Sequence, residues 1–130
     1  MDATFHLSLG VPELQPSMAF FTDILSAEVR HLDPSGYVNL ELAGIQLTLK
    51  ENPDAKPDSQ PSELHFGINV DVDAFERILA SVRRRAPGSL IAEPRVVDAG
   101  TPLERRKLYL RCPAGYLLEI KGFRKQGVAA

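Results

Sequence analysis

The sequence contains one cysteine and no tryptophan, and neither sign of charge is in large excess. A single cysteine excludes a disulfide within the chain, which favours the reducing cytoplasm as its location. We expect Cys112 to be a small buried residue. The formal net charge of −2 gives no field that would attract nucleic acid or an anionic membrane surface. Charge therefore indicates neither of these partners.

Long apolar runs are also missing. No segment approaches the ~18 apolar residues that span a bilayer, and residues 1–6 lack the basic start and apolar stretch of a signal peptide. The notable basic run, residues 83–85, falls at the end of a predicted helix, where cations complement the helix dipole. We therefore expect a cytoplasmic protein that binds no membrane.

The sequence does have enough apolar residues for one core. Its 130 residues, 44% of them hydrophobic, fit a single domain over residues 1–130. Residues 51–62 contain three prolines and no large apolar side chain, so we expect them to form an exposed linker. This linker joins two modules of similar length, residues 4–50 and 63–122.

Both modules show the same order of predicted elements: strand, helix, strand, strand, strand. In the first module, the apolar spacing predicts them at residues 5–10, 16–25, 28–32, 37–42 and 45–49. In the second, it predicts them at residues 64–70, 73–82, 90–92, 107–111 and 116–121. Asp73 and Glu76 resemble a capping box that opens the second helix. The repeat predicts an α+β fold in which two βαβββ modules form curved, mostly antiparallel half-barrel sheets around a shared cleft.

Three side chains with metal-binding chemistry fall on predicted strands. His6 and His65 occupy the same point in the first strand of each module, and Glu119 lies in the last strand. Alternation places each opposite its apolar neighbours, on the cleft face. Singly, a strand histidine is usually structural and a strand glutamate usually faces water. Together, two imidazoles and a carboxylate facing inward would be costly without compensation, and they match a divalent-metal site with open positions.

These residues resemble the vicinal oxygen chelate superfamily, also called the glyoxalase/bleomycin resistance/dioxygenase superfamily. The resemblance covers nearly the whole chain and is most specific in the turn Cys112-Pro-Ala-Gly115 that precedes Glu119. The family favours aspartate where this sequence has Cys112, a difference that concerns a turn hydrogen bond. The resemblance implies that His6, His65 and Glu119 hold one divalent ion, Fe²⁺, Mn²⁺, Ni²⁺ or Zn²⁺. It also implies a small-molecule substrate that chelates the ion through neighbouring oxygens, and a homodimer.

The family resemblance leaves the reaction open among three activities. Tyr109 lies ten residues before Glu119. Ring-cleaving dioxygenases and fosfomycin-modifying members of the family place a tyrosine at this offset. We therefore expect dioxygenase-like chemistry with Tyr109 and Glu119 as catalytic residues. Against ring cleavage, residues 50–64 lack the additional histidine of those dioxygenases, which are also commonly longer chains. Gln46 aligns with the strand of the additional glyoxalase I ligand, so the alternative is a lyase or isomerase that uses Glu119 as ligand and base. The third activity is metal-free binding of a small molecule, as in the bleomycin-resistance members.

Further polar residues are candidates for substrate contact. Ser8 shares a strand face with His6, and Gln46 could orient substrate instead of binding the ion. Lys107 and Arg111 flank Tyr109 at strand alternation. We expect Lys107 to offer positive charge to an anionic substrate and Arg111 to be an exposed strand end.

His31 lies on a predicted edge strand and has no counterpart in the second module. We therefore expect it to face solvent or to be structural, and we leave it out of the metal site.

Overall fold

The computed structural model describes residues 2–55 and 65–124. The chain divides into two compact units, of which unit 1 holds residues 2–55 and the turn residues 113–115, and unit 2 holds the other described residues. Each unit has one four-stranded sheet and one α-helix. Residues 56–62 of the predicted linker and Leu64 of a predicted strand lie outside the described residues.

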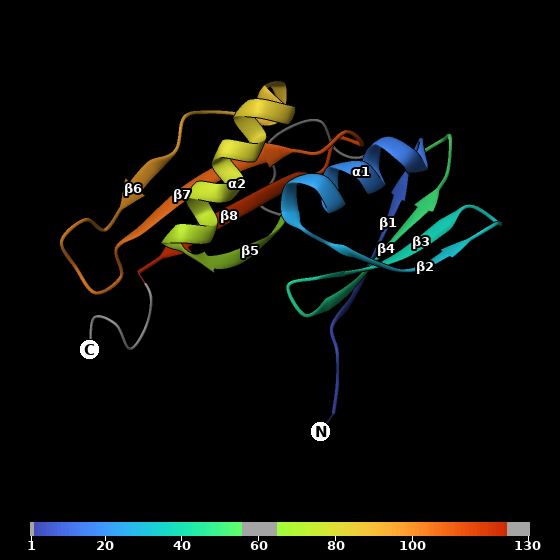
Figure 1. Ribbon diagram of the computed structural model, residues 1–130, viewed down its shortest axis with the longest axis horizontal. Helices are drawn as coiled ribbons and strands as arrows, with labels where there is room; N and C mark the ends of the chain where they lie inside the picture. The colour runs from blue at the N-terminus through green and yellow to red at the C-terminus, as the bar shows by residue number, and fades with distance from the viewer. Residues whose placement is uncertain (1, 56–64, 125–130) are drawn as a thin grey trace. The chain divides into compact units, whose positions relative to one another are not determined.

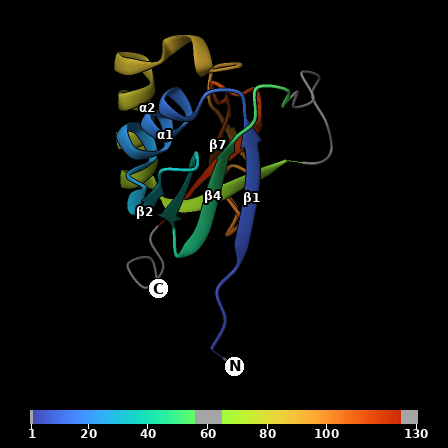
Figure 2. The same cartoon turned by 90° about the vertical axis from the view of Figure 1, so that its right-hand side faces the viewer.

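Unit 1 has the order β-α-β-β-β. Its elements are β1 (His6–Val11), α1 (Leu14–Leu25), β2 (Glu28–Asp33), β3 (Tyr37–Leu42) and β4 (Ile45–Glu51). The strand order in the sheet is β1-β4-β3-β2. β1 runs parallel to β4, beside which it lies in Figure 2, and the other two pairs are antiparallel.

The core of unit 1 lies between its sheet and α1. Apolar side chains alternate with polar ones along the strands, so one sheet face is apolar. On α1 they recur at helical spacing and cover that face. The buried residues include Leu9, Val11, Phe20, Phe21, Ile24, Val38, Leu40, Leu42, Leu47 and Leu49.

Unit 2 repeats this order with one short addition. Its elements are β5 (Phe66–Asp71), α2 (Val72–Arg85), the 3-10 helix η1 (Pro87–Ser89), β6 (Arg95–Val97), β7 (Arg105–Arg111) and β8 (Leu117–Phe123). The strand order is β5-β8-β7-β6, equivalent to that of unit 1, and again only the pair of first and last strands is parallel. Figure 1 shows α2 lying across one face of this sheet.

Close packing in unit 2 depends on two glycines. A Cβ at Gly122 would lie 2.6 Å from the Cβ of Phe75, so α2 approaches β8 closely. A Cβ at Gly67 would collide with the carbonyl group of Glu119, because β5 lies against β8 there. The fully buried side chains of this core include Phe75, Val82, Leu110, Leu118 and Ile120.

The predicted fold class is confirmed: the chain has two βαβββ modules with largely antiparallel sheets. The strand predicted at residues 90–92 is wrong, since Leu90 makes only an isolated bridge with Leu110. The second strand of that module is β6, at Arg95–Val97, which pairs with β7. Pro94 follows the apolar run and has no N–H to donate to a ladder, which explains why the run does not continue as a strand.

The predicted capping box at Asp73 is also wrong. α2 begins at Val72, and the Asp71 side chain accepts a hydrogen bond of 2.7 Å from the Ala74 N–H. Asp73 lies within the first turn, where its charge favours the positive end of the helix. Strand β5 leads directly into α2, so the last strand residue is the one that caps the helix.

The structure also tests three smaller predictions. Cys112 is buried, Arg83–Arg85 form the last turn of α2, and His31 is exposed on the edge strand β2. Among the described residues, the structure contains no helix of the length and apolarity that crossing a membrane requires.

Candidate functional site

The predicted catalytic residues Tyr109 and Glu119 lie opposite each other on neighbouring strands of unit 2. Leu108, Leu110 and Leu118 are buried beneath α2, so alternation turns Tyr109 and Glu119 toward the other face of the sheet. This second face, which α2 does not cover, carries the candidate site residues of unit 2.

Glu119 is the most buried charged group of this face, with 7% of its surface exposed. Its two carboxylate oxygens contact different lysines. Lys107 Nζ lies 3.2 Å from Oε2, and Lys121 Nζ lies 3.3 Å from Oε1. The carboxylate is therefore compensated by two ammonium groups of the same sheet.

His65 and Tyr109 complete the surroundings of Glu119. His65 Nε2 lies 3.9 Å from Glu119 Oε1, and the imidazole meets the Tyr109 ring edge-on, with 5.9 Å between centroids. The Lys107 ammonium lies 5.1 Å from the centroid of the Tyr109 ring, within the range of a cation–π contact. The structure thus brings four predicted site residues of unit 2 together.

The pKa values follow from these contacts. Burial raises the pKa of Glu119, but hydrogen bonding to Tyr109, Lys107 and Lys121 outweighs burial and lowers the pKa to about 2. Hydrogen bonding with Tyr109 and the contact with Glu119 raise the pKa of Lys107 despite its partial burial. At neutral pH the site therefore holds an ionised carboxylate and a charged ammonium.

In unit 1, the candidate residues His6, Ser8 and Gln46 lie on two paired strands. The parallel ladder pairs His6 with Gln46 and Ser8 with Thr48. These positions alternate with the apolar residues that face α1, so they share the other face of the sheet. On this face Thr48 donates a hydrogen bond of 2.8 Å to the Asn39 side-chain oxygen.

The ladders of the two units show which positions correspond. If His6 corresponds to His65, then Leu7, paired with Leu47, corresponds to Phe66, paired with Leu118. The next position along each last strand is Thr48 in unit 1 and Glu119 in unit 2. By this register Gln46 lies beside His6, whereas Thr48 is the counterpart of Glu119.

The predicted triad draws on both units, with His6 in unit 1 and His65 and Glu119 in unit 2. Its convergence on one ion stays a prediction, as do the roles of Ser8 and Gln46. Within each unit, no three His, Cys, Asp or Glu side chains of the described residues are grouped as metal ligands.

His65 and Glu119 fit a divalent ion as two of its ligands. Nitrogen and oxygen ligands lie about 2.0–2.2 Å from an ion such as zinc, so one ion could contact both atoms across their 3.9 Å separation. In this structure the two carboxylate oxygens of Glu119 form ion pairs with Lys107 and Lys121. Binding of an ion by Glu119 would require at least one ammonium to move away.

Lys121 is a site residue that the sequence prediction missed. It follows Glu119 by two positions, so the alternation that placed Lys107 beside Tyr109 also places Lys121 on the face of Glu119. The signal was present in the sequence.

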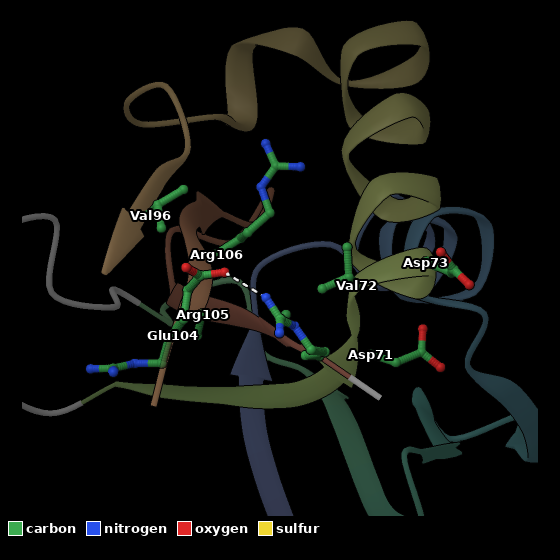
Figure 3. A pocket seen from close by; sticks show the side chains of 9 residues that line it. Asp71, Val72, Asp73, Val96, Glu104, Arg105 and Arg106 are labelled. Atoms are coloured by element: carbon green, nitrogen blue, oxygen red, sulfur yellow. Dashed lines mark ion pairs between the residues drawn. The ribbon is translucent and has the colours of Figure 1, made fainter. Parts of the chain in front are cut away.

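A cavity of about 420 Å³ lies elsewhere in unit 2, at the start of α2 (Figure 3). Its lining residues are Asp71, Val72, Asp73, Val96, Glu104, Arg105, Arg106, Gly122 and Arg124. Its arginines have acidic partners: Arg124 pairs with Glu104, the pair marked by the dashed line in Figure 3, Arg105 with Asp98, and Arg106 with Glu76. None of the predicted site residues lines this cavity.

Comparison with known proteins identifies the fold. No family model matches the chain, and no curated protein sequence matches it. Among solved structures, a glyoxalase/bleomycin resistance protein/dioxygenase from Alicyclobacillus acidocaldarius is similar at a TM-score of 0.76 and 21% identity, over 95% of this chain and 93% of that one. A glyoxalase/dioxygenase from Nostoc punctiforme is similar at a TM-score of 0.72 and 18% identity, over 95% and 92% of the two chains.

A third similar structure contains a metal and a small molecule. It is a variant of the fosfomycin resistance protein FosX from Listeria monocytogenes, complexed with Mn(II) and 1S,2S-dihydroxypropylphosphonic acid. Its TM-score is 0.75 and its identity 19%, over 95% of this chain and 93% of that one. The predicted resemblance to the glyoxalase/bleomycin resistance/dioxygenase superfamily is confirmed by these three structures at the level of the fold.

Proposed function

We propose that the chain is a divalent-metal-dependent enzyme that acts on a small molecule, with His6, His65 and Glu119 as the metal ligands. The observation that carries the proposal is the approach of His65 Nε2 to within 3.9 Å of Glu119 Oε1. An imidazole and a buried, ionised carboxylate are two of the donor types of a facial His-His-carboxylate site, and here they lie close enough for one ion to contact both.

The proposed substrate chelates the ion through two neighbouring oxygens. A divalent ion at this site would supply a Lewis acid that polarises those oxygens. Tyr109 lies close to both His65 and Glu119, where its hydroxyl could donate a hydrogen bond to a substrate oxygen. The FosX complex supports this proposal, since a protein of similar fold contains both Mn(II) and 1S,2S-dihydroxypropylphosphonic acid, a small molecule with hydroxyls on neighbouring carbons.

We propose dioxygenase-like chemistry as the reaction. Its support is Tyr109, placed directly opposite the ligand carboxylate of Glu119 on the neighbouring strand. Two proteins of similar fold, from Alicyclobacillus acidocaldarius and Nostoc punctiforme, also carry the word dioxygenase in their names. The alternative, a glyoxalase I-like lyase or isomerase, is favoured by Gln46, which the ladder places beside His6 as a further oxygen donor.

A metal-free binding protein of the bleomycin-resistance type is the other candidate. It is favoured by Lys107 and Lys121, which already neutralise the Glu119 carboxylate without any ion. In this case the open sheet faces would bind a ligand and no reaction would follow.

We further propose that the protein is a cytoplasmic homodimer. The single cysteine favours a reducing compartment. The edge strand β2 carries exposed Val29 and Leu32. A second subunit that covered an exposed sheet edge would prevent that edge from pairing non-specifically with strands of other chains.

Metal analysis of protein purified without added ions separates an enzyme from a binding protein. The proposal expects about one divalent ion per chain, lost in His65→Ala and retained in His31→Ala, which removes an exposed histidine of β2. No ion, even after addition of Fe²⁺, Mn²⁺, Ni²⁺ or Zn²⁺, would contradict a metal enzyme and favour the binding protein.

The metal found then directs the activity assays. If iron is present, oxygen uptake with catechols tests the dioxygenase-like reaction, and Tyr109→Phe should lower its rate. If nickel or zinc is present, hemithioacetals of glutathione and other thiols test the lyase or isomerase alternative. Turnover of hemithioacetals without oxygen uptake would contradict the dioxygenase assignment.

A further inference from the structure

Lys107 and Lys121 lie directly opposite each other on β7 and β8. Like charges at opposite positions destabilise an antiparallel pair, and these side chains are only 18% and 35% exposed. Glu119 offsets the repulsion by giving one carboxylate oxygen to each ammonium. The two lysines together therefore form a site for two negatively charged oxygens, and a side chain of the protein fills it.

The fold itself does not require this arrangement. At the equivalent ladder positions of unit 1, Tyr37 lies opposite Lys50, and Thr48 replaces Glu119. Thr48 forms a neutral hydrogen bond with Asn39. The second lysine and the carboxylate are additions of unit 2 to a ladder that forms without them in unit 1.

The charges of this cluster do not balance. Two ammonium groups face one carboxylate, so the cluster carries one net positive charge. If a divalent ion takes the Glu119 carboxylate, both lysines lose their carboxylate partner and also face the ion, so the net positive charge of the cluster rises. An anionic group of the substrate would offset part of this charge.

We propose that Lys107 and Lys121 bind an oxyanion group of the substrate, either a carboxylate or a phosphonate. Until this group binds, the Glu119 carboxylate forms ion pairs with both ammonium groups. The inference rests on the proposed function, because it names the substrate class of the same site. Each ammonium offers three hydrogen-bond donors. The Lys107 ammonium also lies 5.1 Å from the centroid of the Tyr109 ring, within the range of a cation–π contact. Release of Glu119 to the ion and arrival of the oxyanion at the lysines are linked steps.

This linkage has a measurable consequence. Coupling between two sites is reciprocal, and it commonly changes affinity about 5- to 150-fold. The oxyanion should therefore tighten binding of the ion within this range, and the ion should tighten binding of the oxyanion by the same factor.

Calorimetric titration of Mn²⁺ into the metal-free protein tests the inference. Titrations are run alone, with methylphosphonate and with acetate, so that the two arms distinguish a phosphonate from a carboxylate. The wild type should bind Mn²⁺ at least about 5-fold more tightly with one of the anions. The double variant Lys107→Gln/Lys121→Gln should lose this enhancement, and without anion it should bind Mn²⁺ more tightly than the wild type because two like charges are gone.

Arg84→Gln is the control, since it removes a positive charge from an exposed position of α2 and should keep the enhancement. Circular dichroism and thermal unfolding confirm that each variant is folded. Equal Mn²⁺ affinity with and without both anions, or an enhancement that persists in the double variant, would overturn the inference.

The proposed function can fail separately. If the wild type binds no Mn²⁺, Fe²⁺, Ni²⁺ or Zn²⁺, the metal enzyme is excluded. Titration of Glu119→Gln, in which the lysines lose their carboxylate partner, with the two anions then decides the inference alone. Binding of either anion by Glu119→Gln, and its loss when Lys107→Gln and Lys121→Gln are added, would uphold the oxyanion site, and absence of binding by Glu119→Gln would refute it.

Discussion

Replacing Glu119 by glutamine should destabilise the protein in a pH-dependent manner. Glutamine keeps the size of the side chain but removes the charge that separates Lys107 from Lys121. The two ammonium groups then remain opposite each other, mostly shielded from water, with a neutral amide between them. The expected loss is therefore electrostatic rather than steric.

The magnitude follows from the pKa of Glu119, which is about 2 in the folded protein against an ordinary value of 4.5. This difference corresponds to about 3 kcal/mol of unfolding free energy at pH 7, at about 1.4 kcal/mol for each pH unit. Because the folded-state pKa is the lower one, the unfolded chain binds the proton more readily. The stabilisation is therefore complete above about pH 5 and is lost as the pH falls from 4.5 toward 2, with about 1.5 kcal/mol left at pH 3.

Urea unfolding of the wild type and Glu119→Gln in the presence of EDTA, at pH 7.5, 4 and 3, measures this difference. The gap between the two proteins should be about 3 kcal/mol at pH 7.5 and should shrink by about half at pH 3. Glu93→Gln is the control, since it breaks the exposed ion pair with Arg83 and should cost less than about 1 kcal/mol. A gap that is absent, or that stays constant across the three pH values, would refute the electrostatic account of Glu119.

Two further substitutions test the packing around the site. Gly67→Ala should destabilise the protein by more than about 2 kcal/mol, because the new methyl group would collide with the backbone of β8. Gly88→Ala is the control, since its methyl group would have no atom within 4 Å. Similar thermal unfolding of the two variants would contradict the close approach of β5 and β8. Asp71→Ala should cost about 1 kcal/mol through loss of the cap of α2, and Asp73→Ala should cost less; in urea unfolding, a larger effect of Asp73→Ala would indicate that the cap is misassigned.

The fold could be predicted from the sequence because each sheet has one face on a helix. In β3, Val38, Leu40 and Leu42 are buried, and the residues between them face the other side. This period of two is visible in the letters alone. The same pattern in the second module predicted β7 and β8.

The prediction failed where local patterns compete with long-range pairing. The apolar run at residues 90–92 is as typical of a strand as residues 95–97. Both segments reach β7, but Leu90 makes one isolated bridge to it, whereas Arg95–Val97 form a continuous ladder. Asp71 and Asp73 are both good helix caps by residue type. Which of them caps α2 depends on where β5 ends.

The site was predictable only within each module. Alternation alone placed Tyr109, Lys107 and Glu119 on one face, as the structure confirms. The two ammonium contacts of Glu119 required coordinates, since contact between side chains depends on their rotamers and on the twist of the sheet. The proposed joint action of His6 and His65 would depend on packing between modules, which alternation within a strand does not encode.

The central claim is that His6, His65 and Glu119 bind the same ion. A crystal structure of the protein soaked with Mn²⁺, with anomalous scattering recorded at the manganese edge, tests it most directly. We predict one strong anomalous peak within about 2.2 Å of an imidazole nitrogen of each histidine and of a carboxylate oxygen of Glu119. No peak at Glu119, or a peak bound by Glu119 without both histidines, would contradict the claim.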